Sequence, residues 1–190
     1  MRSDFPQKTK DFFKRMENYL DTDFYYYGSV NRPDYVHDKS DIDIGIFTDN
    51  EYSMMTKIQH FLHVKKDAFD KVVWKIEGNI IYGYKIKCIK YINSKCEISI
   101  YNNNFKHLVL DQMKINNNLP SYILIMLFFL KTFYYTFPIL TLNAYNNYKD
   151  LIFKLNRRLV NKQHSNFFVI KTTRDKTNKT NKTNKTNKTS

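Results

Sequence analysis

Apolar side chains recur along the first half of the chain with two different periods, which separate predicted helices from predicted strands. In residues 10–20 and again in residues 51–64, large apolar residues return every three or four positions, as on one side of a helix. In residues 41–47, apolar and polar positions alternate, which indicates a strand with one buried face. The aromatic run at residues 24–27 reads as a shorter strand before it.

From residue 72 to residue 101 the pattern is typical of further strands. Residues 80–92 and 95–101 form two such segments, and Asn93-Ser94 between them suits a two-residue hairpin turn. In that register Glu97 lies opposite Lys90, on the side of its strand that points away from the apolar positions.

Residues 119–142 are almost wholly apolar or aromatic and long enough to suggest a membrane span. Lys131 at the centre is costly in a bilayer, and Pro138 ends a helix near the residue before it. We therefore expect a buried helix over residues 120–137, packed against the sheet or against a following helix at about residues 145–160. A membrane-associated protein anchored by residues 119–142 is kept as an alternative.

The order of these elements predicts an α/β (α+β) fold, a small mixed β-sheet flanked by helices. We expect a core over residues 1–105 and a helical subdomain over residues 106–168. Residues 169–190 are predicted to be a disordered basic tail, because from residue 171 onward Thr-Asn-Lys repeats offer no apolar side chain to bury.

Composition adds a basic charge and an unusual bias. The 190 residues carry a formal net charge of +13 and include 25 Lys and 21 Asn, a bias that resembles proteins of large A/T-rich DNA viruses. A basic chain suits nucleotides or nucleic acid such as RNA, although coding bias accounts for it equally well. Two cysteines and no signal peptide favour a reducing, cytoplasmic setting.

One stretch combines a turn with paired carboxylates. Gly28-Ser29 follows the first predicted strand, and Asp41 and Asp43 open the second, twelve residues after Ser29. On a strand both Asp side chains point to the same face, with Cα atoms about 6–7 Å apart, close enough to share Mg²⁺. Because neighbouring carboxylates repel, a cation between them removes a penalty. The alternative is an ordinary turn followed by two solvent-facing aspartates.

These residues resemble the signature of the DNA polymerase β-type nucleotidyltransferase superfamily. The resemblance implies that Gly28 and Ser29 hold the triphosphate of a nucleotide and that Asp41 and Asp43 bind catalytic magnesium. Ser40 matches the small residue that often precedes the first aspartate, and it is a further candidate for the nucleotide site.

The superfamily also has a third carboxylate, usually aspartate, on a later strand. Glu97 in Cys-Glu-Ile-Ser-Ile has that setting, with a side chain one methylene longer, so the resemblance implies that it is a catalytic residue and a third ligand of magnesium. Glu77 is the alternative. A purely structural interpretation of Glu97 is a cross-strand salt bridge with Lys90.

One departure leaves the acceptor open. Small antitoxin-like members usually carry Ala-Arg-Gly after the Gly-Ser, whereas this chain has Val-Asn-Arg-Pro at residues 30–33. Arg32 within it is a candidate phosphate contact. The resemblance implies an enzyme that uses two Mg²⁺ ions to move a nucleoside monophosphate from a triphosphate, with ATP favoured, to an unidentified hydroxyl. The rival is a catalytically inactive module that binds nucleic acid on the same fold.

Overall fold

A six-stranded mixed sheet forms the centre of the computed structural model, which describes residues 4–88, 95–137, 140–160 and 166–170. For residues 157–160 and 166–170 we describe only the main chain. The strand order is β1-β2-β5-β4-β3-β6, and β2 with β5 is the one parallel pair of this sheet. The strands are β1 Tyr25–Tyr27, β2 Ile42–Thr48, β3 Asp70–Ile76, β4 Asn79–Lys87, β5 Cys96–Asn102 and β6 Asn166–Ile170.

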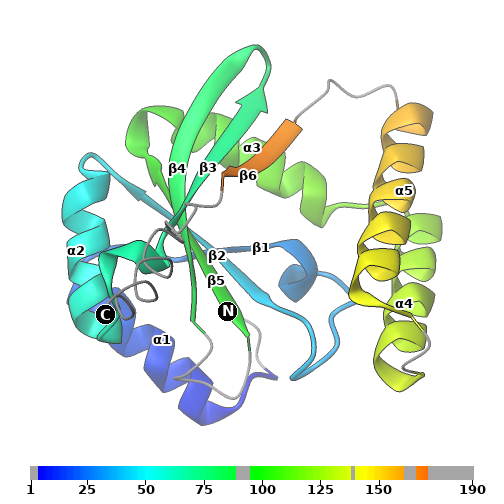
Figure 1. Ribbon diagram of the computed structural model, residues 1–190, viewed down its shortest axis with the longest axis horizontal. Coiled ribbons are helices and arrows are strands. Elements are labelled where there is room, and N and C mark those ends of the chain that lie inside the picture. Colours follow the sequence, from blue (N-terminus) through cyan, green and yellow to red (C-terminus); the bar gives the residue numbers. More distant parts are fainter. Residues whose placement is uncertain (1–3, 89–94, 138–139, 161–165, 171–190) are drawn as a thin grey trace, which may run out of the picture.

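Helices cover both faces of this sheet, which confirms the predicted fold class. Figure 1 shows α1 and α2 together on one side of the sheet and α3 on the other. The buried isoleucines of β2 and β5 pack with α1 and α2, while Phe47 and Tyr101 pack with α3. The helices are α1 Gln7–Leu20, α2 Glu51–Leu62, α3 Lys106–Asn117, α4 Ser121–Thr136 and α5 Leu142–Val160.

The alternation predicted for β2 is confirmed. Ile42, Ile44 and Ile46 are fully buried against α1 and α2. The opposite side carries Asp43 and Phe47, and Phe47 is also buried. The later part of β2 therefore packs on both faces of the sheet. Asp43 is therefore half-buried and does not stand on an open, solvated face.

The predicted register of β4 and β5 is wrong by three residues. Glu97 lies opposite Lys87, not Lys90, and β4 ends at Lys87. The observed register places Ile86 opposite Ile98, and both are buried in one core. Ile89 would fill the same place in the predicted register, so the apolar pattern alone allows either pairing. The predicted turn at Asn93-Ser94 lies outside the described residues.

The C-terminal helices form a separate hairpin beside the sheet, as Figure 1 shows. The helices predicted over residues 120–137 and 145–160 are α4 and α5, and they pack on each other through Ile123, Leu127 and Ile152. Residues 166–170 then form β6 along β3, so residues 169 and 170 belong to a strand and not to the predicted tail. The rest of that tail lies outside the described residues.

No single helix within the described ranges is long and apolar enough to cross a membrane. Residues 103–117 and α4 reach that length and composition only as a pair, and the pair is bent by 76°.

Candidate functional site

The Gly-Ser turn and the second aspartate are in direct contact. Gly28 follows β1 and opens a short 3₁₀ turn, Gly28–Asn31, with φ at +75°, where glycine is favoured. A Cβ atom at Gly28 would lie 2.6 Å from Oδ2 of Asp43. The Gly28 N–H donates to Oδ1 of Asn117 at the end of α3, 2.9 Å away, which fixes the turn from the other side. The two halves of the motif thus meet, and only a residue without a side chain fits between them.

Asp43 has a second carboxylate beside it. In the sheet it pairs with Tyr27 of β1 on one side and with Glu97 of β5 on the other. Because paired residues of neighbouring strands point to the same face about 4.8 Å apart, the two carboxylates are close neighbours. Burial, and then the charge of Glu97, raise the pKa of Asp43 to about 7, with a smaller contribution from Asp41. This concentration of negative charge is what a bound cation would relieve.

Glu97 also takes part in a salt bridge, though not with the predicted partner. Lys85 contacts Oε2 of Glu97, and Nζ of Lys87 lies 3.3 Å from Oε1. Burial alone would raise the pKa of the Glu97 carboxyl, but the two lysines outweigh it and hold that pKa below its usual value. Glu97 therefore combines both predicted settings: it lies beside Asp43 and is neutralised from β4.

Glu77, the alternative third carboxylate, lies elsewhere. It occupies the turn between β3 and β4 at a positive φ of 49°, and it is exposed. Two strands, β5 and β4, separate β3 from β2 in the sheet, so Glu97 is the later carboxylate next to Asp43.

The carboxylates have the ligand atoms that magnesium prefers, but their side chains are not grouped around a single ion site. Asp41 and Asp43 supply hard oxygen ligands, and Asp43 packs directly against the main chain of Gly28. Asp41 lies immediately before β2 and is half-buried. Across the ranges that the structure describes, however, no three His, Cys, Asp or Glu side chains are grouped so that they could hold a metal ion. The donors fit a cation bound through the aspartates, and Glu97 would join only after exchanging its lysine partners.

Ser29 and Ser40, the two predicted serines, have different surroundings. Ser29 is half-buried in the turn, where its carbonyl accepts the N–H of Arg32 at 2.9 Å. Ser40 is buried, and its Oγ accepts hydrogen bonds from the N–H of Val36, at 3.1 Å, and from Nζ of Lys131, at 3.4 Å. Ser40 thus holds together the loop that leads into β2.

Arg32, the predicted phosphate contact, points into the protein. Its guanidinium donates to both carboxylate oxygens of Asp34, at 2.7 and 3.1 Å, and to the carbonyl oxygen of Asn116 at 3.1 Å. The Arg32 side chain is 5% exposed and that of Asp34 is fully buried. These contacts give Arg32 a structural task between the loop and the end of α3.

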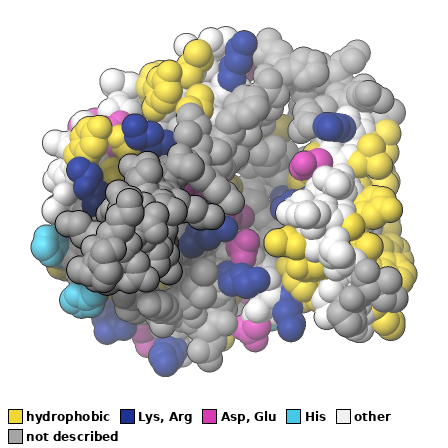
Figure 2. All heavy atoms as spheres, in the orientation of Figure 1, with side chains coloured by type: hydrophobic (Ala, Val, Ile, Leu, Met, Phe, Trp, Pro, Cys, Tyr) yellow, Lys and Arg dark blue, Asp and Glu magenta, His cyan; other side chains and the backbone are white. Residues whose placement is uncertain are grey.

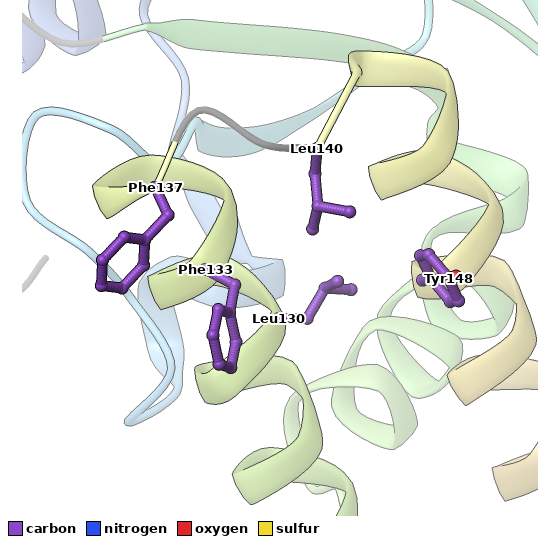
Figure 3. A pocket seen from close by; sticks show the side chains of 5 residues that line it. All are labelled: Leu130, Phe133, Phe137, Leu140 and Tyr148. Carbon is purple, nitrogen blue, oxygen red and sulfur yellow. The ribbon is translucent and has the colours of Figure 1, made fainter.

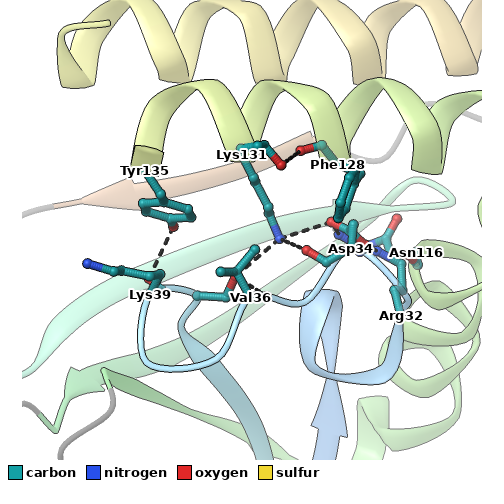
Figure 4. A network of polar contacts seen from close by, with 10 residues as sticks. Arg32, Asp34, Val36, Lys39, Asn116, Phe128, Lys131 and Tyr135 are labelled. Carbon is teal, nitrogen blue, oxygen red and sulfur yellow. Dashed lines mark hydrogen bonds and ion pairs between the residues drawn. The ribbon is translucent and has the colours of Figure 1, made fainter. Parts of the chain in front are cut away.

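Lys131 of α4 binds the same aspartate, a contact that sequence reasoning missed. Its Nζ lies 2.9 Å from Oδ2 of Asp34 and 2.8 Å from the carbonyl oxygen of that residue (Figure 4). Tyr135, one turn further along α4, donates to the carbonyl oxygen of Lys39 at 3.1 Å. The signal in the sequence was a single lysine inside an apolar helix, which implies a buried partner of opposite charge.

A hollow lies in the surface beside the helical hairpin (Figure 2). Figure 2 shows this hollow between the part built on the sheet and the α4–α5 hairpin, with side chains of both charges along it. Lys149 of α5 and Lys85 of β4 both lower the pKa of Asp43, against the larger effects that raise it. Positive groups from two elements thus act on Asp43, as expected where an anionic phosphate is to be placed beside carboxylates.

Comparison with known proteins identifies the family. The family model described as a nucleotidyltransferase domain matches residues 6–124, which is more than half of the chain and includes every predicted site residue. No curated protein and no solved structure matches this chain significantly. On the family match the chain belongs to the nucleotidyltransferase domain family, within the polymerase β-like nucleotidyltransferase superfamily.

Proposed function

We propose that this chain catalyses magnesium-dependent transfer of a nucleoside monophosphate from a nucleoside triphosphate, with ATP as the favoured donor, to a hydroxyl group. The observation that carries the proposal is the contact between the two halves of the motif: Gly28 touches Asp43, and Asp43 lies beside Glu97. A glycine turn whose main chain lies against paired carboxylates suits this reaction. Family membership supports nucleotidyl transfer in general.

Each site residue then has a role. Gly28 lets the phosphates approach the main chain, and Ser29 offers its hydroxyl and N–H groups to them. Asp41 and Asp43 would hold magnesium, which supplies the positive charge that phosphoryl transfer needs. The acceptor oxygen forms a bond to the α-phosphorus while the bond to pyrophosphate breaks. Glu97, at the acceptor side, would take the proton released by the hydroxyl.

The lysines around Glu97 favour a second candidate. Lys85 and Lys87 already neutralise Glu97. Lysines beside carboxylates that do not catalyse a reaction would suit a module that binds nucleic acid through its phosphates. Such a module would bind RNA tightly and in a salt-sensitive way, with no turnover of triphosphate.

The test measures transfer directly. The full chain is incubated with each labelled triphosphate, Mg²⁺ and candidate acceptors (RNA, protein and small hydroxyl compounds), and both labelled product and released pyrophosphate are measured. Asp43→Asn should keep the fold and abolish transfer, whereas Asp23→Asn, at an exposed aspartate outside the site, should leave it unchanged. Full activity of Asp43→Asn rules out the assignment, and RNA binding without turnover selects the second candidate.

A further inference from the structure

One side of α4 is apolar, exposed and uncharged. Ile125, Phe129 and Phe133 of α4, and Phe137 directly after it, follow each other at intervals of four residues, and each is between 49% and 56% exposed. The opposite side, with Ile123, Leu127 and Lys131, is buried. Lys131 is the one charge in α4, and it is directed inward to Asp34, so this outer side offers water no charge at all. A helix that is apolar on all sides is normally covered on all sides.

The neighbouring helix extends this side into a wider surface. Tyr148, Leu151 and Leu155 of α5 recur at helical spacing and are between 39% and 61% exposed. A cavity of about 330 Å³ between the helices is lined by Leu130, Phe133, Phe137, Leu140 and Tyr148, as Figure 3 shows. Figure 2 shows hydrophobic side chains gathered along the hairpin. We call these seven exposed side chains, with Tyr122 and Met126, the outer face of the hairpin.

The outer face is large enough for a stable protein contact. Nine side chains that are each about half exposed, at 150–250 Å² for a whole aromatic residue and less for an aliphatic one, give roughly 800 Å². That area equals what each partner buries in a standard protein–protein interface, about 800 Å². It exceeds the few hundred Å² of the largest apolar patch on a typical monomer.

The chemistry of this surface narrows what can cover it. Residues 171–190 of the chain contain no apolar side chain, so that segment cannot replace water there. Nucleic acid needs cations for its phosphates, and the outer side of α4 has none. A second copy of the chain supplies a surface of the same shape, polarity and lack of charge on α4. Two antiparallel helix pairs meeting face to face about a two-fold axis also form a four-helix arrangement.

We propose that the outer face of the α4–α5 hairpin is the interface of a homodimer. The two hairpins pack through their phenylalanines and bury the cavity between α4 and α5. This inference rests on exposed area and composition, and it holds whether or not the chain transfers nucleotides.

The test is sedimentation velocity of the full chain from about 1 to about 100 µM, since interfaces of this area range from micromolar to picomolar affinity. Wild type should sediment with twice the mass of the chain. Phe129→Glu and Leu151→Glu, one on each helix, should each weaken the dimer at least about 30-fold, as expected for central interface residues. Tyr82→Glu, at a tyrosine of β4 that is at least as exposed as either test residue, is the control and should remain dimeric.

Circular dichroism and the fluorescence of Trp74 establish that each variant is folded, and both substitutions are at exposed positions. A wild type that is monomeric across the range overturns the proposal. So does a dimer whose dissociation constant, measured by dilution to below the wild-type value, is raised by neither glutamate variant, because its interface must then lie elsewhere. Flotation of the monomer with phosphatidylcholine vesicles, lost in Phe129→Glu, would overturn it in favour of a lipid surface.

Discussion

The buried charges around Asp34 predict that two neighbouring substitutions have very different costs. The group contains two cations, Arg32 and Lys131, and one anion. Asp34→Asn leaves both buried cations without the carboxylate that they contact, so we expect it to lower the free energy of unfolding by about 3–5 kcal/mol. Lys131→Met leaves the Arg32–Asp34 pair neutral and intact.

The lysine substitution should therefore be mild. It removes charge-assisted hydrogen bonds to the carboxylate and carbonyl of Asp34, worth about 1.5–3 kcal/mol where a charged group takes part. Against this loss stands relief from burying the ammonium: burial lowers the pKa of Lys131, and the charge of Arg32 adds to the effect, although Asp34 opposes both. Methionine also fills most of the same volume on α4. We expect a net cost of about 1 kcal/mol, well below that of Asp34→Asn.

The assay is urea unfolding at neutral pH, followed by circular dichroism and by the fluorescence of Trp74. The double variant Asp34→Asn/Lys131→Met should be more stable than Asp34→Asn alone, because it removes one of the two cations that the first substitution strands. Asp34 does not compensate the charges of Arg32 and Lys131 if Asp34→Asn lowers the free energy of unfolding by less than about 1 kcal/mol, or if Lys131→Met lowers it as much as Asp34→Asn does. Either result refutes the reasoning.

Three further predictions concern the carboxylates. In the absence of metal, Asp43→Asn should raise the free energy of unfolding at pH 8 by about 2–4 kcal/mol, and below pH 4 the variant and wild type should be equally stable. The reason is that a folded-state pKa of about 7 makes wild type less stable as Asp43 ionises between pH 4 and 7. Urea unfolding at several pH values measures this difference, and a difference that does not change with pH would refute the reasoning. Gly28→Ala should destabilise more than Gly78→Ala, since both have positive φ but a Cβ meets Asp43 only at Gly28; equal unfolding midpoints would contradict the contact. Lys85→Met should bind Mg²⁺ more tightly in calorimetry, because the lysine competes for Glu97, and unchanged affinity would show that Glu97 is not a ligand.

The parts of the site that the sequence predicts are those set by local geometry. Alternation along β2 places Ile42, Ile44 and Ile46 on one side and Asp43 on the other without knowledge of any partner. A glycine directly after an aromatic strand likewise marks a turn. These features follow from side-chain direction along a single stretch of chain, and the structure confirms them.

Pairing between strands that are distant in the sequence is harder to predict from the sequence. The parallel contact of β2 with β5 brings Glu97 beside Asp43, and no periodicity within either strand specifies it. The resemblance to a family suggested that neighbour, whereas the hairpin register failed because Ile86 and Ile89 are equally suitable partners for Ile98. Where two residues of one kind compete for a place in the core, the apolar pattern alone cannot choose between them.

The apolar stretch around α4 shows why composition alone was ambiguous. Its hydropathy suggested a membrane span because apolar residues occur on both sides of the helix, yet the two sides have different partners. The inner side packs on α5 and sends Lys131 to Asp34, 97 residues away in sequence, which ties the hairpin to the loop before Asp41. The outer side meets no element among the described residues that buries it. Lys131, which would oppose insertion into a bilayer, thus serves as the partner of Asp34 on the inner side of α4. The apolar residues on its outer side are those that a second copy of the chain would cover.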